Sequence, residues 1–298
     1  MPAEVNFHRD VLWSLPVLRR AVKIVSAALL ICVALSTSAH AAPSNGDPVP
    51  PASVLRQIER LVPQRPGVID VYALVVGGDG SERVFQREVA VVRTRLEERL
   101  QASGHVVTLV NNRGLPQPEA TISSLEYVVQ RLSERMDKGQ DLLFLHLTSH
   151  GARDHSLVLA HPRQELNWLG KKELANILRR SGIRHRFIVI SGCYSGGFIP
   201  DLANDNTVVV TASASTVTSY GCGDKSEITN FSRVFYTQAL TRSRPLTQVA
   251  RLAVQYVHED ETRSRLAHSY PQVFIGTHME DYLRQLDLQL STNAPNTH

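Results

Sequence analysis

Cysteine and net charge are both scarce in this chain. Its 298 residues include only three cysteines, and the formal net charge is +4. Half of that charge belongs to the first 41 residues, so the remainder is too weakly basic to indicate a nucleic-acid partner. Internal repeats and low-complexity tracts are also lacking. Aromatic residues make up only 6% of the chain, but 43% of the residues are hydrophobic, which is enough for one large domain with a full core.

The amino terminus has an apolar run that is too short for a stable membrane span. Residues 24–35 are apolar, and a basic segment at residues 19–23 precedes them. Residues 39–41 read Ala-His-Ala, which fits a cleavage site between small residues. This order is typical of an export signal over residues 1–41 and predicts a periplasmic or secreted protein. An uncleaved amino-terminal membrane anchor is the alternative.

Short apolar runs and helical patterns alternate along the rest of the chain. Six runs are typical of strands, at residues 68–76, 105–110, 141–148, 186–191, 207–212 and 272–276. The alternation predicts an α/β fold, with a mostly parallel six-stranded sheet and helices on both faces. We expect a linker and a leading helix at residues 42–66, one folded domain at 67–290, and a disordered tail at 291–298.

The run at residues 186–191 leads into a cysteine that has a glycine before it. Cys193 follows this predicted strand where a helix is expected to begin. Unpaired backbone N–H groups and the positive end of a helix dipole favour a thiolate there. Once residues 1–41 are removed, only Cys193 and Cys222 remain, and an exported protein usually uses cysteines in pairs. Either these two form one disulfide, or at least one is kept as a thiol for chemistry.

A histidine and a glycine lie just beyond the preceding strand, residues 141–148. Function in parallel sheets gathers at the carboxyl ends of the strands, and neighbouring strands lie about 4.8 Å apart. We therefore expect His150 and Cys193 to meet at one rim of the sheet. An imidazole can take a proton from a thiol and later give one to a leaving amine. The backbone N–H groups of Gly151 and Cys193 would stabilise the oxyanion.

Three short segments carry a family resemblance. Residues 148–151 read Thr-Ser-His-Gly, residues 191–198 read Ser-Gly-Cys-Tyr-Ser-Gly-Gly-Phe, and residues 219–224 read Ser-Tyr-Gly-Cys-Gly-Asp. With these segments the chain resembles the legumain-like cysteine peptidases, family C13 of the caspase-related clan, as a bacterial-type exported member. The resemblance implies a caspase-like three-layer α/β sandwich and a polypeptide substrate, with no cofactor. It also implies a catalytic dyad, with Cys193 as nucleophile and His150 as general acid/base, that passes through a thioester acyl-enzyme.

The resemblance also implies a specificity pocket for the residue before the cut. Arg87 matches the arginine of this pocket, Asp224 matches its acidic member, and Ser219 lines it. Such a pocket implies cleavage after Asn or Asp. Two positions depart from the legumain pattern. Ser191 replaces an acidic residue that helps to define the asparagine pocket, and Phe85 falls near the asparagine that supports the catalytic histidine.

Two other functions fit the same residues. An amine in place of water would displace the thioester, which would make the protein a transpeptidase or transamidase. A non-catalytic caspase-like binding module is the third hypothesis, although the intact Cys193 and His150 argue against it. His146 is expected to be a core or supporting histidine rather than a metal ligand, because no second cluster has ligand spacing. No metal site is predicted.

Overall fold

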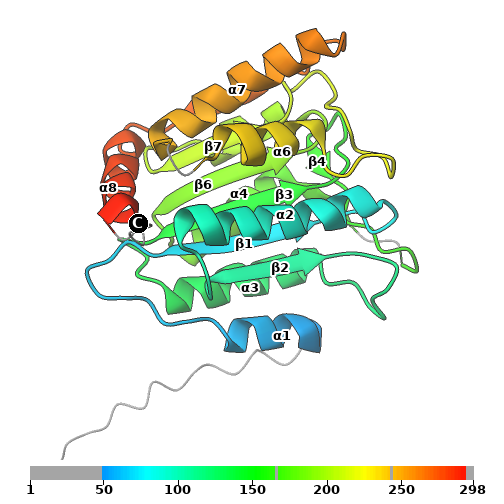
Figure 1. The fold of residues 1–298 in the computed structure, drawn as a ribbon. Helices are drawn as coiled ribbons and strands as arrows, with labels where there is room; N and C mark the ends of the chain where they lie inside the picture. Colours follow the sequence, from blue (N-terminus) through cyan, green and yellow to red (C-terminus); the bar gives the residue numbers. More distant parts are fainter. Residues whose placement is uncertain (1–48, 165–166, 242–243, 293–298) are drawn as a thin grey trace, which may run out of the picture. The chain divides into compact units, whose positions relative to one another are not determined.

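A six-stranded sheet forms the centre of the protein in a computed structural model that describes residues 49–164, 167–241 and 244–292 (Figure 1). The strand order is β2-β1-β3-β6-β7-β8. These strands are β1 (Val71–Gly77), β2 (Val106–Val110), β3 (Leu142–Thr148), β6 (His185–Ser191), β7 (Thr207–Thr211) and β8 (Gln272–Ile275). All neighbours pair in parallel except β7 and β8, which are antiparallel. Two short strands, β4 (Ser156–Leu157) and β5 (Leu169–Gly170), form a separate antiparallel pair.

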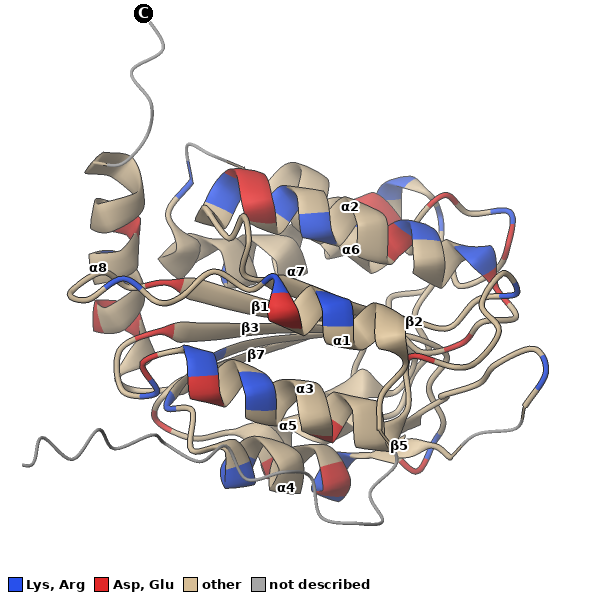
Figure 2. Cartoon of the chain, turned by 90° about the horizontal axis from the view of Figure 1, so that it is seen from below, with Lys and Arg blue, Asp and Glu red and all other residues tan. Residues whose placement is uncertain are grey.

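Helices cover both faces of the large sheet, as Figure 2 shows. One face is covered by α2 (Arg83–Leu100), α6 (Asn230–Val234), the π-helical segment η2 (Phe235–Ala239) and α7 (Leu246–Arg263). The other face is covered by α3 (Ile122–Arg135), α4 (Lys171–Ser181), the 3₁₀ segment η1 (Ser195–Phe198) and α5 (Ile199–Leu202). The leading helix α1 (Ala52–Glu59) packs near β2, and α8 (Met279–Thr292) joins the core of the α2 side.

The central strands are buried on both faces, which explains their continuous apolar sequences. Successive side chains of a strand point to opposite faces of the sheet. In β1, the side chains of Val71, Ala73 and Val75 join the core under α2 and α7, and those of Tyr72, Leu74 and Val76 join the core under α3 and α4. A parallel sheet between two helical layers needs apolar residues at both the odd and the even positions of its strands.

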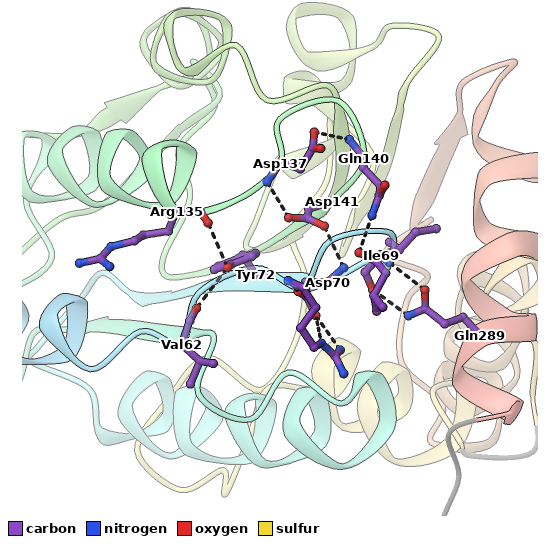
Figure 3. A network of polar contacts seen from close by, with 11 residues as sticks. Val62, Ile69, Asp70, Tyr72, Arg135, Asp137, Gln140, Asp141 and Gln289 are labelled. Atoms are coloured by element: carbon purple, nitrogen blue, oxygen red, sulfur yellow. Dashed lines mark hydrogen bonds and ion pairs between the residues drawn. The ribbon is translucent and has the colours of Figure 1, made fainter. Parts of the chain in front are cut away.

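A polar network fixes the amino-terminal ends of β1 and β3 (Figure 3). The carboxylate of Asp141 accepts hydrogen bonds from the backbone N–H of Asp70 at 2.9 Å and from that of Asp137 at 2.7 Å. Burial, as the largest influence, raises the pKa of Asp141 to about 6. The side-chain amide of Gln289 in α8 pairs with both backbone groups of Ile69. These contacts hold the amino-terminal ends of the strands, which lie opposite the rim where His150 and Cys193 are expected.

The predicted six-stranded, mostly parallel sheet with helices on both faces is confirmed. The structure also contains the short strands β4 and β5, and α8 extends through Thr292, into the expected tail. Within the described ranges, none of the helices has both the length and the apolar character to cross a bilayer. The predicted export signal at residues 1–41 lies outside the described residues and stays a prediction.

Candidate active site

The ends of β3 and β6 bring the histidine and the cysteine to one rim of the sheet. The two strands pair in parallel, with Thr148 opposite Ser191, and the backbone N–H of Ser149 donates to the carbonyl of Ser191 at 3.2 Å. His150 and Cys193 each stand two residues beyond that pair, and both are half-buried. The expectation that the strands before the two residues are neighbours is confirmed.

The backbone after the nucleophile candidate forms a turn rather than the start of a long helix. Tyr194 adopts a left-handed conformation with φ of 57°, and η1 begins only at Ser195. The N–H of Tyr194 donates to the carbonyl of Val217 at 2.9 Å, and that of Gly196 donates to Ser213 at 2.9 Å. The helix expected after Cys193 is present as η1 and the α5 that follows it directly, which have four residues each.

The loop after β7 supplies the groups that act on the Cys193 sulfur. The sulfur accepts a hydrogen bond from the backbone N–H of Ser219 at 3.4 Å, and the hydroxyl of Ser219 lies 3.7 Å away. The thiol of Cys222 has the largest effect on the pKa of Cys193, which falls to about 5 although burial opposes the change. Ser219 and the charge of His150 lower it further. Cys193 therefore favours the thiolate at neutral pH.

His150 is oriented by packing against an aromatic ring. Its imidazole meets the ring of Phe85 edge to face, with centroids 5.2 Å apart and an interplanar angle of 86°. Phe85 is fully buried in the first turn of α2. A phenyl ring cannot accept a conventional hydrogen bond from the imidazole, so shape rather than hydrogen bonding restricts the plane of His150.

Gly151 lies directly against the peptide group of Cys193. A side-chain Cβ at this position would stand 2.1 Å from the carbonyl oxygen of Cys193 and 3.1 Å from its nitrogen. Gly151 also faces Leu157 across an antiparallel bridge, in which its neighbours, Ala152 and His150, make the hydrogen bonds. At such a position the N–H points away from the partner strand. Gly151 therefore directs its N–H away from β4, and only a residue without a side chain fits there.

Two of the predicted pocket residues lie close to Cys193. Ser191 is two residues before it in the chain, and Ser219 contacts its sulfur. Ser191 is buried, and its hydroxyl pairs with that of Thr229 at 2.9 Å. The hydroxyl of Ser219 lies between two sulfurs, 3.7 Å from that of Cys193 and 3.8 Å from that of Cys222. Hydroxyl groups both donate and accept hydrogen bonds, so these two serines add polar groups beside Cys193 without adding charge of their own.

The other two predicted pocket residues, Arg87 and Asp224, tie the loop after β7 to α2. The guanidinium of Arg87 donates to the backbone carbonyls of Asp224 at 3.0 Å, Glu227 at 3.1 Å and Ser226. The exposed carboxylate of Asp224 accepts from the backbone N–H of Arg83 at 2.6 Å. Since Arg83 is the first residue of α2, Asp224 acts as a cap for a helix that lacks a cap from its own side chains. Both side chains hold the loop in place through these bonds.

The arrangement agrees with a comparison to protein families. A model of the peptidase C13 family matches residues 129–281, just over half of the chain. The chain belongs to the peptidase C13 family. Membership indicates a cysteine-type peptidase, a hydrolase with a polypeptide substrate, and the sheet agrees with the caspase-like sandwich. Comparison with curated proteins gives no match.

The C13 match includes His150, Cys193 and the loop after β7, but not α2. The roles given to Phe85 and Arg87 are therefore supported by their contacts in the structure and not by the family match.

No cluster of three or more His, Cys, Asp or Glu side chains suited to a metal ion occurs within the described residues.

A buried carboxylate close to the candidate active site was not predicted. Glu88 is fully buried in α2, and it accepts from the hydroxyl of Ser232 at 2.6 Å and from the backbone N–H of Thr229 at 3.1 Å. It also pairs with the imidazole of His146 at 3.0 Å, whose other nitrogen lies 2.9 Å from the hydroxyl of Tyr236. Burial raises the pKa of Glu88, but the hydrogen bonds outweigh burial and bring it below its usual range. The network joins α2, β3, α6 and η2.

The expectation that His146 is a supporting core histidine agrees with this position. A signal for Glu88 was present in the sequence, because it occupies one place in a row of buried residues spaced by four, with Val84, Val92 and Leu96. A charged residue in a helical apolar stripe needs a buried partner.

Proposed function

We propose that the protein is a cysteine endopeptidase with Cys193 as the nucleophile and His150 as the general acid/base. The observation that carries the proposal is the setting of the Cys193 sulfur, which accepts the N–H of Ser219 at 3.4 Å and whose pKa is lowered to about 5, first by Cys222 and then by Ser219 and His150. Attack on a peptide carbonyl requires a thiolate with a proton donor for the leaving amine beside it. Neither the dyad nor the residue before the cut follows from family membership alone.

The proposed reaction runs through a thioester. The Cys193 sulfur bonds to the carbonyl carbon, and the electron pair of the carbonyl moves onto its oxygen. The N–H groups of Gly151 and Cys193 donate to this oxyanion. Protonated His150 gives its proton to the leaving nitrogen as the C–N bond breaks. His150 then accepts a proton from water while the water oxygen attacks the thioester, and the carboxylic product leaves as Cys193 returns to the thiolate.

We propose Asn or Asp as the residue before the cut. The hydroxyls of Ser219 and Ser191 supply groups that both donate and accept, which a primary amide or a protonated carboxyl can use. Arg87 supports this corner indirectly, because its guanidinium fixes the carbonyls of the loop that carries Ser219.

The test is Cys193→Ala, assayed with a peptide library varied at the residue before the cut and with an electrophilic peptide that labels thiolates. We expect loss of cleavage and of labelling in this variant. In the full chain, which still carries residues 1–41, Cys32→Ser is the matched control, because it removes a different cysteine and should retain both activities. Full cleavage by Cys193→Ala would refute the proposed nucleophile. An amine-bearing peptide added in excess separates hydrolysis from transpeptidation, since only the latter gives a ligated product.

A further inference from the structure

The Cys193 sulfur has a second sulfur as its neighbour. Both cysteines are free thiols, and the hydroxyl of Ser219 is 3.7 Å from the sulfur of Cys193 and 3.8 Å from that of Cys222. One hydroxyl group therefore lies within reach of both sulfurs. The proposed peptide hydrolysis uses only the sulfur of Cys193, so it gives the sulfur of Cys222 no chemical role.

The two sulfurs differ in protonation. The Cys222 thiol is the main cause of the low pKa of Cys193, and the same contact raises the pKa of Cys222 far above its ordinary value. Burial and the charges of Cys193 and Glu88 raise the pKa of Cys222 further. One sulfur is therefore a thiolate and the other a thiol at neutral pH. A low-pKa thiolate next to a second thiol is the combination that reacts with peroxides and then closes to a disulfide.

The backbone around Cys222 leaves room for the sulfurs to approach. Cys222 lies between Gly221, which adopts φ of +81°, and Gly223, which has nothing within 4 Å of where a side chain would begin. The loop is held at both ends, by the bond from Tyr194 to Val217 and by the hydrogen bonds of Thr229. Between these bonds, the carbonyl of Tyr220 accepts from Asn230, and Arg87 holds the backbone of Asp224, so a shift of Cys222 toward Cys193 is confined to residues 221–223.

We propose that Cys193 and Cys222 form a redox-active dithiol site that takes a hydroperoxide as its substrate. The Cys193 thiolate attacks one oxygen of hydrogen peroxide and the O–O bond breaks, which gives a sulfenic acid on Cys193 and hydroxide. The Cys222 sulfur then attacks the sulfenic sulfur, forms the disulfide and releases water, so that two thiols are oxidised and one peroxide is reduced. A dithiol reductant reverses the step by disulfide exchange.

The consequence is reversible protection of the nucleophile. A thiolate left alone with excess peroxide proceeds to sulfinic and sulfonic acids, which dithiol reductants do not restore. The disulfide stops this progression and also blocks the sulfur that would attack the substrate. The effect on peptidase activity rests on the proposed function, but the disulfide itself does not.

The experiment uses the full chain with Cys32→Ser, so that only the two thiols of the site remain. The protein is treated with hydrogen peroxide, unfolded, alkylated with iodoacetamide and examined by intact mass and peptide mapping. We expect loss of two hydrogen atoms, no alkylation, and one cross-linked pair of peptides that contain Cys193 and Cys222. Dithiothreitol should return both thiols. With Cys222→Ser added, the same treatment should leave Cys193 as an oxygen adduct that dithiothreitol does not fully reverse.

Two results would overturn the inference. One is an oxygen adduct on Cys193 with an alkylated Cys222 in the protein that retains both cysteines. The other is a disulfide that links two chains, visible as a dimer on a non-reducing gel. Neither readout depends on proteolysis, so a protein that forms the internal disulfide but cleaves no peptide would remove the proposed function and leave the dithiol site standing.

Discussion

Gly151→Ala tests the oxyanion site with the smallest change that a side chain permits. The φ of Gly151 lies outside the left-handed region, so alanine suits its backbone, and the perturbation is a contact alone. The new Cβ would stand 2.1 Å from the carbonyl oxygen of Cys193. The two atoms must separate by about 1 Å or more to reach ordinary van der Waals contact. Because the partner is backbone rather than a flexible side chain, the Cys193 peptide itself has to move.

A misplacement of this size at reacting groups costs about 10²-fold in rate. We therefore expect kcat/KM for a peptide substrate to fall roughly 10²-fold in Gly151→Ala. Alkylation of Cys193 by iodoacetamide needs the thiolate but no oxyanion donor, so its rate should fall much less. If kcat/KM falls much more than the alkylation rate, the change acts on the oxyanion site and not on the fold as a whole.

Gly170→Ala is the matched control. Gly170 precedes α4, and a Cβ there would meet nothing within 4 Å, so kcat/KM should stay unchanged. The reasoning would be refuted if Gly151→Ala kept kcat/KM within about twofold of the parent, or if its alkylation rate fell as far as its peptidase rate.

Two further predictions concern protons. The rate of Cys193 alkylation should stay constant as the pH falls to about 5 and decline below that, because the thiolate is protonated there. In Ser219→Ala, the pH at which the rate is half its maximum should be higher. If this pH were near 8 or 9 in the parent protein, the assigned contacts of the Cys193 sulfur would be contradicted. The carboxyl of Asp141 has a folded pKa raised to about 6, above its unfolded value of about 3.9, so the folded state binds more protons between these values. The melting temperature of the parent should therefore rise relative to Asp141→Asn as the pH is lowered from 7 to 4, and a difference that is independent of pH would count against this.

The parts of the site that lie on strands could be predicted from the sequence. Strand ends are marked by apolar runs, and a parallel sheet aligns those ends at one rim, so the meeting of His150 and Cys193 follows from the positions of two runs. Neighbouring strands could be inferred because consecutive elements usually lie adjacent in space.

The parts that lie on loops could not be predicted in the same way. The segment from Ser213 to Thr229 has no periodicity, and only its folded path brings Cys222 to the sulfur of Cys193 and Asp224 to the first turn of α2. The left-handed turn and the short 3₁₀ segment after Cys193 could not be predicted either, because no apolar pattern gives a signal for them. The partners of Glu88 could not be identified from the sequence, because Thr229 and Ser232 lie more than 140 residues further along the chain.

The polar network around Asp141 lies at the start of β3, the strand whose other end leads to His150. Each central strand has seven residues, so roughly 20 Å separates the two ends. Free-energy effects of substitutions more than about 10 Å apart usually add without coupling. Changes made at one end of the strands, to strengthen the fold, can therefore be combined with changes at the other end, to alter cleavage, and their separate effects should sum. The length of these strands therefore allows substitutions that change stability and substitutions that change specificity to be made independently in this chain.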